Sequence, residues 1–187
     1  AGNSITATAT CLDSNNAAVA AGIPIAWLYA PGAGNSGTAT GFASGVTYTD
    51  ATGKATVTFT PSTIAGDTFT ITATSGGASG TSAALTVDNS LTLGSYTVVV
   101  GTTQVAGSTF TVNLKAWDIY GNFMDDYANT HTVTLTGLSN SVNGATPTYG
   151  TTTAVFGSGI ASLTGNVAVA AETTAITVTN NTTNTIK

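Results

Sequence analysis

The fold is decided by two stretches of similar pattern, Ile5-Thr-Ala-Thr-Ala-Thr-Cys-Leu-Asp13 and Phe110-Thr-Val-Asn-Leu-Lys-Ala-Trp-Asp118. In both, apolar or small residues alternate with polar ones, and the run ends on an aspartate. A period of two is typical of a half-buried β-strand, because successive side chains of a strand point to opposite faces. The two stretches lie 105 positions apart, which indicates that one structural unit occurs twice.

Two further matches along the chain support this repeat. Residues 66–74 (GDTFTITAT) align with residues 171–179 (AETTAITVT), again at an offset of 105. Between them, residues 53–58 (GKATVT) align with residues 159–164 (GIASLT) at an offset of 106. Threonine-rich strands match one another easily, but the same offset at both ends of a unit indicates two copies of one domain.

Each copy consists of short alternating segments separated by turn residues, with no sustained helical period. This pattern predicts an all-β fold of two tandem immunoglobulin-like antiparallel β-sandwich domains, residues 1–89 and 90–187. The segment 75–80 (SGGASG) is expected to be a loop inside the first domain. The expected strands are 4–11, 24–29, 45–49, 54–60, 67–74, 81–87, 95–100, 109–117, 131–136, 151–156, 160–164 and 173–179. The expected turns are 13–16, 50–53, 118–122 and 157–159.

The composition points to a surface covered by hydroxyl groups rather than by charge. Hydrophobic residues make up 42% of the chain, which is enough for a core, whereas charged residues make up 6%, against about 25% in ordinary globular proteins. The alternative is merely a threonine-rich β protein, because the β-branched side chain of threonine favours strands. Together these features favour an extracellular, cell-surface protein that packs into arrays or carries glycans.

Charge and the length of apolar runs argue against nucleic-acid binding and against membrane insertion. Arginine is absent, the three bases are lysines, and the net charge is −5, whereas nucleic-acid binding needs clustered Lys and Arg. No apolar run reaches the roughly 20 residues that a membrane-spanning helix needs, so membrane insertion is not expected. A chain that starts at Ala1 without Met is typical of an exported product after signal-peptide removal, and equally of a segment of a longer protein.

The sequence contains few residues that could act in catalysis. Cys11 and His131 are the single cysteine and histidine. Cys11 shares a strand face with Ile5, Ala7 and Ala9 and is expected to be a small buried hydrophobe rather than a linker between chains. His131 lies in an alternating strand, so it is expected to be a plain strand residue. Trp27 and Tyr29 share one strand face, which favours core packing over sugar stacking. We therefore predict no enzyme activity.

One cluster of oxygen ligands leaves two interpretations open. Asp118, Asn122, Asp125 and Asp126 lie within nine residues of a turn, and such hard ligands suit calcium. The spacing differs from an EF-hand loop, and the alternative is a solvated turn in which Asp118 accepts hydrogen bonds from backbone amides. No other cofactor is expected.

Two overlapping N-glycosylation patterns occur near the end of the sequence. Asn180 and Asn181 each stand two residues before a threonine. Such matches arise easily in a chain rich in threonine, and only a host that glycosylates proteins would use them.

The pattern of residues 49–60 (TDATGKATVTFT) followed by 65–73 (AGDTFTITA) resembles the bacterial immunoglobulin-like repeats of the invasin and intimin type. Residues 106–112 (AGSTFTV) and 116–122 (AWDIYGN) of the second copy resemble related repeats of prokaryotic cell-surface proteins. The resemblance implies the sandwich fold and a place in stalks, adhesins, surface layers or fibres, and it implies no catalytic residues. The second copy departs from the pattern over 137–150, where the loop is longer.

Three functions follow as hypotheses. The first is a structural subunit or segment of an extracellular filament, surface layer or stalk that self-associates. The second is an adhesin module that binds a glycan or host protein through loops 30–44 and 137–150. The third is an accessory domain of a glycoside-active enzyme.

The repeat also predicts how copies would join. The second copy has a strand at 95–100 that the first copy lacks. The counterpart of strand 81–87 would fall at 186–192. Missing strands leave unpaired backbone groups beside an uncovered core, so we expect head-to-tail polymerisation by donor-strand complementation. The alternative is that the chain is a piece of a longer array of repeats, in which the missing strands lie on either side in the parent chain.

Overall fold

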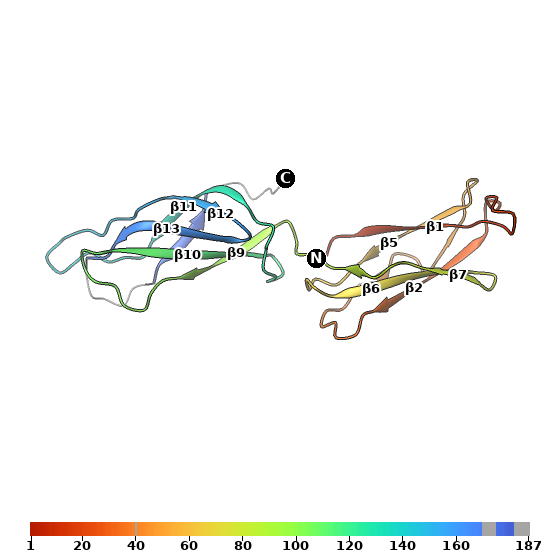
Figure 1. Cartoon of the computed structure of the whole chain (residues 1–187), viewed down its shortest axis with the longest axis horizontal. Coiled ribbons are helices and arrows are strands. Elements are labelled where there is room, and N and C mark those ends of the chain that lie inside the picture. The colour runs from red at the N-terminus through yellow and green to blue at the C-terminus, as the bar shows by residue number, and fades with distance from the viewer. Residues whose placement is uncertain (40, 170–174, 182–187) are drawn as a thin grey trace. The chain divides into compact units, whose positions relative to one another are not determined.

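The computed structural model describes residues 1–39, 41–169 and 175–181 (Figure 1). The chain divides into two compact units, unit 1 (Ala1–Asn89) and unit 2 (Ser90–Lys187). All strand pairs in the described residues are antiparallel. In that part of the chain no helix has the length and apolarity that a membrane crossing requires. The predicted all-β class of immunoglobulin-like sandwiches is confirmed.

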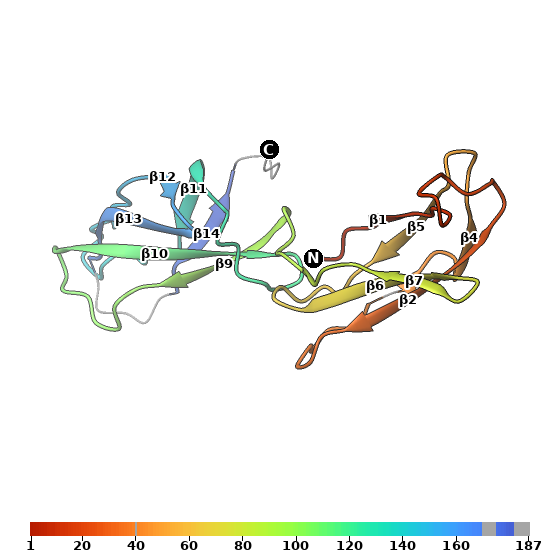
Figure 2. The ribbon, with the colours of Figure 1, turned by 45° about the vertical axis from the view of Figure 1, so that its right-hand side comes forward.

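Unit 1 is a sandwich of two sheets. One sheet has the order β1-β5-β3, and the other has the order β4-β2-β6-β7 with β8 also paired to β6. Figure 2 shows β1 and β5 in one layer of this unit and β2, β6 and β7 in the other. The strands of this unit are β1 (Ile5–Thr10), β2 (Pro24–Pro31), β3 (Gly41–Phe42), β4 (Val46–Tyr48), β5 (Lys54–Thr60), β6 (Thr68–Ser75), β7 (Ala78–Thr81) and β8 (Leu85–Thr86).

Unit 2 repeats the central strands of both sheets and adds one strand at an edge, but in the described residues it has six strands where unit 1 has eight. One sheet has the order β13-β10-β9, and the other has the order β12-β11-β14. The strands of this unit are β9 (Leu93–Val99), β10 (Thr109–Asp118), β11 (Asn129–Thr136), β12 (Thr153–Phe156), β13 (Ile160–Val167) and β14 (Thr177–Asn180).

The two units share the register of their central strand pair. In unit 1, Ala9 of β1 stands opposite Ala55 of β5. In unit 2, the residues at the repeat offsets, Leu114 of β10 and Ala161 of β13, stand opposite each other in the same way. The correspondence holds from the pair Ala7–Val57, which matches Val112–Leu163, through to the Thr10–Lys54 pair. β1 and β10 are therefore equivalent strands.

The core of unit 1 forms where the inward faces of its sheets meet. Phe59 is completely buried, and its ring centroid lies 5.1 Å from those of Tyr29 and Phe69. Aromatic rings at this separation add attraction beyond the area they bury. Trp27 is buried and donates its indole N–H to the Thr47 hydroxyl at 2.8 Å. The five core residues predicted for this unit are all buried; they are Trp27, Val57, Phe59, Phe69 and Ile71.

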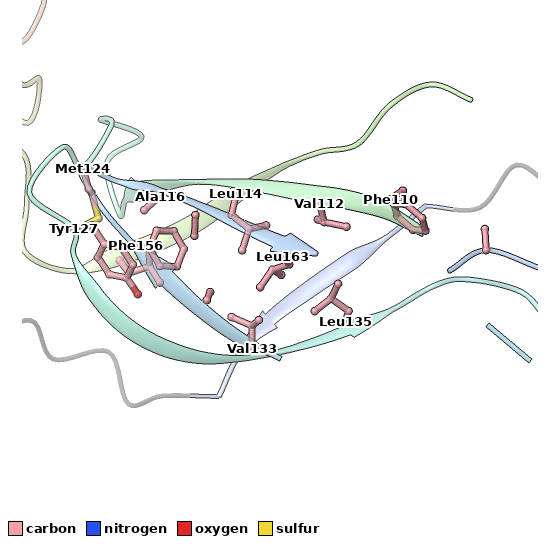
Figure 3. Packing of buried hydrophobic residues seen from close by; sticks show 14 residues of the cluster. Phe110, Val112, Leu114, Ala116, Met124, Tyr127, Val133, Leu135, Phe156 and Leu163 are labelled. Atoms are coloured by element: carbon pink, nitrogen blue, oxygen red, sulfur yellow. The ribbon is translucent and has the colours of Figure 1, made fainter. Parts of the chain in front are cut away.

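The core of unit 2 is larger, and Figure 3 shows its side chains pointing toward one another from β10, β11 and β13. Five of the six residues predicted for it are buried, namely Phe110, Val112, Leu114, Val133 and Leu135. Ile176, the sixth, is only partly buried and packs against the cluster. Met124 and Tyr127, which the alternating pattern did not mark, are also fully buried because the segment after β10 folds back over the core.

The structure of unit 1 differs from the sequence predictions at three places. The segment 75–80 is not simply a loop, since Gly76 and Gly77 form a tight turn and β7 then pairs with β6 from Ala78 onward. Residues 81–87 do not form one strand, because β7 ends at Thr81 and β8 covers two residues. The short strand β3 was not anticipated. The side chains of β7 are all exposed, so backbone pairing rather than burial makes it a strand.

Four turns in the chain share one construction. Asp13, Asp50 and Asp118 each accept hydrogen bonds through Oδ1 from the amides two and four residues later. Ser141 does the same for the amide four residues later through its hydroxyl. The fourth residue of each turn has a positive φ, which glycine and asparagine tolerate best. Those residues are Asn16, Gly53, Gly121 and Gly144.

Candidate functional site

Equivalent positions in the two units differ sharply in burial. On β10, Val112, Leu114 and Ala116 are completely buried. Their counterparts at the repeat offset, Ala7, Ala9 and Cys11, are only half-buried. Phe110 and Met124 of unit 2 are also buried, at 8% and 0% exposure, whereas Ile5 is 36% exposed and Val19 is half-buried. β1 therefore occupies the same position in its sheet as β10, but the inward face of β1 is not covered.

The missing cover leaves an open groove along β1. It has a volume of about 670 Å³ and runs beside β1 from Ile5 to Cys11. Ile25 and Trp27 of β2 and Ile71 of β6 form its floor, and β7 lies along its far side. Every residue that lines the groove is apolar, a glycine, a serine or a threonine, so no charged side chain lines it.

Both rims of the groove are sheet edges. β1 pairs only with β5, and β7 pairs only with β6, within the described residues. An edge strand presents a row of backbone N–H and C=O groups that can pair with a further strand. The groove therefore combines an apolar floor with two hydrogen-bonding rims, which is the arrangement that accepts an added strand.

Unit 2 carries a strand at the corresponding place. β9 pairs antiparallel with the edge of β10, and Val98 and Tyr96 stand opposite Leu114 and Ala116. The Tyr96 ring stacks on Phe156 at 5.3 Å, and its hydroxyl lies 2.9 Å from that of Tyr127. Burial, followed by the Tyr127 contact, raises the pKa of Tyr96, so this strand is held by a neutral aromatic side chain.

Cys11 lies at one end of the groove and is a free thiol. Its amide donates to the carbonyl of Gly53, and its carbonyl accepts from Val19, as in the equivalent bonds of Ala116. It packs partly against the core, in line with the small hydrophobe expected from the sequence. The half-open position follows from the missing cover and was not anticipated.

The predicted calcium cluster is only partly assembled. Asp118 is 2% exposed, and its Oδ2 accepts from the Ser90 amide at 2.6 Å and from the Asn122 side-chain nitrogen at 2.9 Å. Its Oδ1 accepts from the amides of Tyr120 and Asn122. Both oxygens of Asp118 thus face N–H donors, and Asn122 turns its nitrogen, not its oxygen, toward the carboxylate.

Asp125 and Asp126 lie beyond this turn and are exposed. Among the described residues no group of three His, Cys, Asp or Glu side chains is placed to hold a metal ion. Burial of Asp118 acts to raise its pKa, but the hydrogen bonds from Asn122, Ser90 and Tyr120 outweigh it and hold the pKa below its usual value. These contacts give Asp118 a structural role, and calcium binding stays a prediction for chelation to test.

His131 lies in β11 as expected, but its side chain is part of an aromatic cluster. Its ring stacks on Tyr127 at 4.5 Å and meets Phe156 edge-on at 5.7 Å. Its Nε2 lies 2.9 Å from the Ala128 carbonyl oxygen. These contacts make His131 a packing residue of unit 2, and the sequence pattern showed only its strand.

The loop 30–44 is tied to the body of unit 1. The Asn35 side chain donates to the Thr68 carbonyl and accepts from the Thr68 amide, like a short strand pair. Asp67 accepts from the Ser62 hydroxyl and from the amides of Ser36 and Gly37, and these bonds, the Ser62 bond first, lower its pKa.

The loop 137–150 and the two glycosylation candidates belong to unit 2. The Tyr149 hydroxyl accepts from the Leu138 amide at 2.9 Å, and Val142 at the loop tip is 95% exposed. The Asn180 side chain is half-buried and lies 3.5 Å from the Tyr127 hydroxyl, whereas Asn181 is exposed and donates to the Thr134 hydroxyl. Thr182 and Thr183, which complete the two glycosylation patterns, lie outside the described residues.

The comparisons with known proteins found one similar solved structure, and its low TM-score carries no argument about this chain. No family model matches the chain, and no curated protein matches it. A solved structure titled "D0-D1 domain of Intimin" is similar over 96% of this chain and 83% of that chain. The identity is 21% and the TM-score is 0.38.

The repeat predicted that the first copy lacks the strand at 95–100 and leaves part of its core uncovered, and one further signal of the groove was present in the sequence. The inward residues of the first strand are small, Ala7, Ala9 and Cys11, where the second copy has Val112 and Leu114. The far side was hidden because β7 lies in the glycine- and serine-rich segment predicted as a loop. The candidate functional site of this chain is therefore the groove between β1 and β7.

Proposed function

We propose that the chain is a structural subunit or segment of an extracellular surface filament, surface layer or stalk. The observation that carries this proposal is the bare edge of β1, beside an apolar groove, at a position where the equivalent strand β10 is covered by β9. A neighbouring subunit that inserts a strand there completes unit 1. Such a contact joins unlike surfaces, so it builds an open filament when its rotation does not close.

The outer faces of the sheets support a protein that packs beside its own copies. On the first sheet of unit 1, Thr6 stands opposite Thr58 and Thr8 opposite Thr56, and all four side chains are exposed. Hydroxyl groups keep such a surface hydrated and also offer places for glycans.

Electron microscopy and native mass spectrometry of the purified chain test this proposal. We expect fibres or lattices, together with ladders of whole-subunit multiples that resist mild denaturant. A monomer at all concentrations, with surface labelling absent from the cells that produce it, contradicts the proposal.

An adhesin module is the second candidate, and one observation favours it. Val142 projects from loop 137–150 at 95% exposure, and the Tyr149 hydroxyl fixes the base of that loop. An exposed apolar tip on an anchored loop is typical of a contact residue in recognition. Binding of a soluble monomer to a glycan array or host protein, abolished by Val142→Ser, would favour this function over assembly.

A further inference from the structure

The groove of unit 1 defines the chemistry of the strand that fills it. We propose that its occupant is an uncharged, extended strand of a neighbouring subunit that pairs antiparallel with β1 and places large apolar side chains against Ala9 and Cys11. This inference rests on the proposed function, since it names the partner of the same groove. Three features of the molecule support it.

The first feature is the equivalence of β1 and β10. The β1–β5 register from Ala7–Val57 to Thr10–Lys54 repeats the β10–β13 register, and the hydrogen bonds of Cys11 to Gly53 and Val19 repeat those of Ala116 to Gly159 and Met124. The edge of β1 that faces the groove is therefore the edge of β10 that holds β9. What β9 does in unit 2 shows how a strand fits in unit 1.

The second feature is the register between β10 and β9. Because β1 and β10 are equivalent, the same register applies to a strand inserted beside β1. In unit 2, Val98 stands opposite Leu114, and Tyr96 opposite Ala116. At the repeat offset these positions on β1 are Ala9 and Cys11. The pairing is antiparallel, so the inserted strand runs against β1, and every second side chain enters the groove.

The third feature is the size and charge of the groove. Small side chains line β1 where unit 2 has Val112 and Leu114, so the inserted strand must supply the missing volume with large residues of its own. The volume of about 670 Å³ lies within the range of natural binding sites. The seven residues from Ile5 to Cys11 span roughly 20 Å at about 3.3 Å per residue, enough for one strand. A lining without charge favours an occupant without charge, because an unpaired buried charge is costly.

Because the chain has a single cysteine, the rate at which its thiol is labelled shows directly whether a strand occupies the groove. Cys11 lines the groove, and an inserted strand would cover its thiol. A peptide with the β9 sequence, Leu93-Gly-Ser-Tyr-Thr-Val-Val-Val100, serves as the probe. The control is a peptide of the same composition in which the apolar and polar positions are exchanged, so that its apolar side chains would point away from the groove. Added to the full chain, the β9 peptide should slow thiol labelling of Cys11 at least tenfold, and the control peptide should not.

Two substitutions separate the groove from the outer face of the same strand. Ala9→Trp fills the groove, so the β9 peptide should no longer bind. Thr8→Trp places the same side chain on the exposed outer face, so binding should persist. Circular dichroism and the melting temperature check that both variants fold, and the labelling of the unsubstituted chain decides the question even where Ala9→Trp does not fold.

The outcomes distinguish this inference from the proposed function. Equal labelling rates with and without the β9 peptide, or equal protection by both peptides, overturn the assignment of the strand, whether or not fibres form. Selective protection by the β9 peptide that Thr8→Trp retains supports it. A chain whose Cys11 is protected by the peptide but which never assembles or reaches a cell surface contradicts the proposed function and the neighbouring subunit as the source of the strand, whereas it supports the register and the apolar side chains assigned to the occupant.

Discussion

Replacing Asp118 by alanine should destabilise unit 2 strongly, because this carboxylate holds the start of the unit against the end of β10. Its Oδ2 accepts from the Ser90 amide at 2.6 Å, and Ser90 is 3% exposed. A buried N–H that loses its acceptor costs about 1–3 kcal/mol. Loss of the bonds to Tyr120 and Asn122, which water can partly replace, adds about 1 kcal/mol. The expected loss is therefore about 2–4 kcal/mol, a large share of the roughly 5–15 kcal/mol that stabilises a typical domain.

The repeat provides a matched control for this substitution. Asp13 occupies the equivalent position of unit 1 and accepts from the amides two and four residues later, but it is exposed. Asp13→Ala should therefore cost clearly less than Asp118→Ala. Each unit contains one tryptophan, so urea unfolding followed by fluorescence reports on unit 2 through Trp117 in a Trp27→Phe background, and on unit 1 through Trp27 in a Trp117→Phe background. Equal losses of stability for the two alanine variants would refute the reasoning.

The pH dependence of unit 2 offers a second readout of the same bonds. Because hydrogen bonds hold the pKa of Asp118 below its unfolded value, the carboxylate contributes stability above the unfolded pKa of about 3.9. That contribution is lost as the pH falls through the lower folded-state pKa. The stability difference between the unsubstituted chain and Asp118→Ala should therefore shrink at acidic pH, and a difference that stays constant from pH 7 to pH 2 would contradict this assignment.

Three further predictions concern the core, the turns and metal. Phe59→Ala should cost unit 1 about 3–5 kcal/mol in urea unfolding because the ring is fully buried, and a cost below about 1 kcal/mol would contradict the described core. Gly53→Ala should destabilise more than Gly121→Ala in thermal melts, because both have positive φ but only at Gly53 would a Cβ meet a neighbour, the Cys11 carbonyl oxygen at 2.7 Å; equal losses would argue against that close approach. A chelator should leave the melting temperature unchanged, since the Asp118 oxygens already face N–H donors, whereas a fall in melting temperature would establish the calcium site at 118–126.

The alternation of apolar and polar residues, together with the offset between the two copies of the repeat, was sufficient to predict most of the fold. Residues 54–60 form a strand with the predicted bounds because every second side chain is buried, so burial and sequence pattern coincide. The turn at Asp118 was predicted because its aspartate and glycine act locally. These features depend on neighbouring residues only, which is why they can be read from the sequence.

The features that were missed depend on contacts between distant segments. β7 is fully exposed and forms because the β6 backbone pairs with it, so its side chains carry no alternating signal. His131 packs against Tyr127, which comes from the segment after β10, and strand alternation does not reveal such a contact. The repeat predicted the uncovered core beside the first strand but not the far rim of the groove, because β7 begins in the segment that was expected to be a loop.

Hydrogen exchange of β1 tests the central claim most directly, that the bare edge of Ile5–Thr10 accepts a strand from a neighbouring subunit. Amides of β10, which is paired on both edges within one chain, provide the internal reference. In the dispersed chain, β1 should exchange faster than β10. On assembly, the exchange of β1 should slow toward that of β10, while the β10 rates stay unchanged. Assemblies in which the β1 amides exchange as fast as in the dispersed chain would contradict the account.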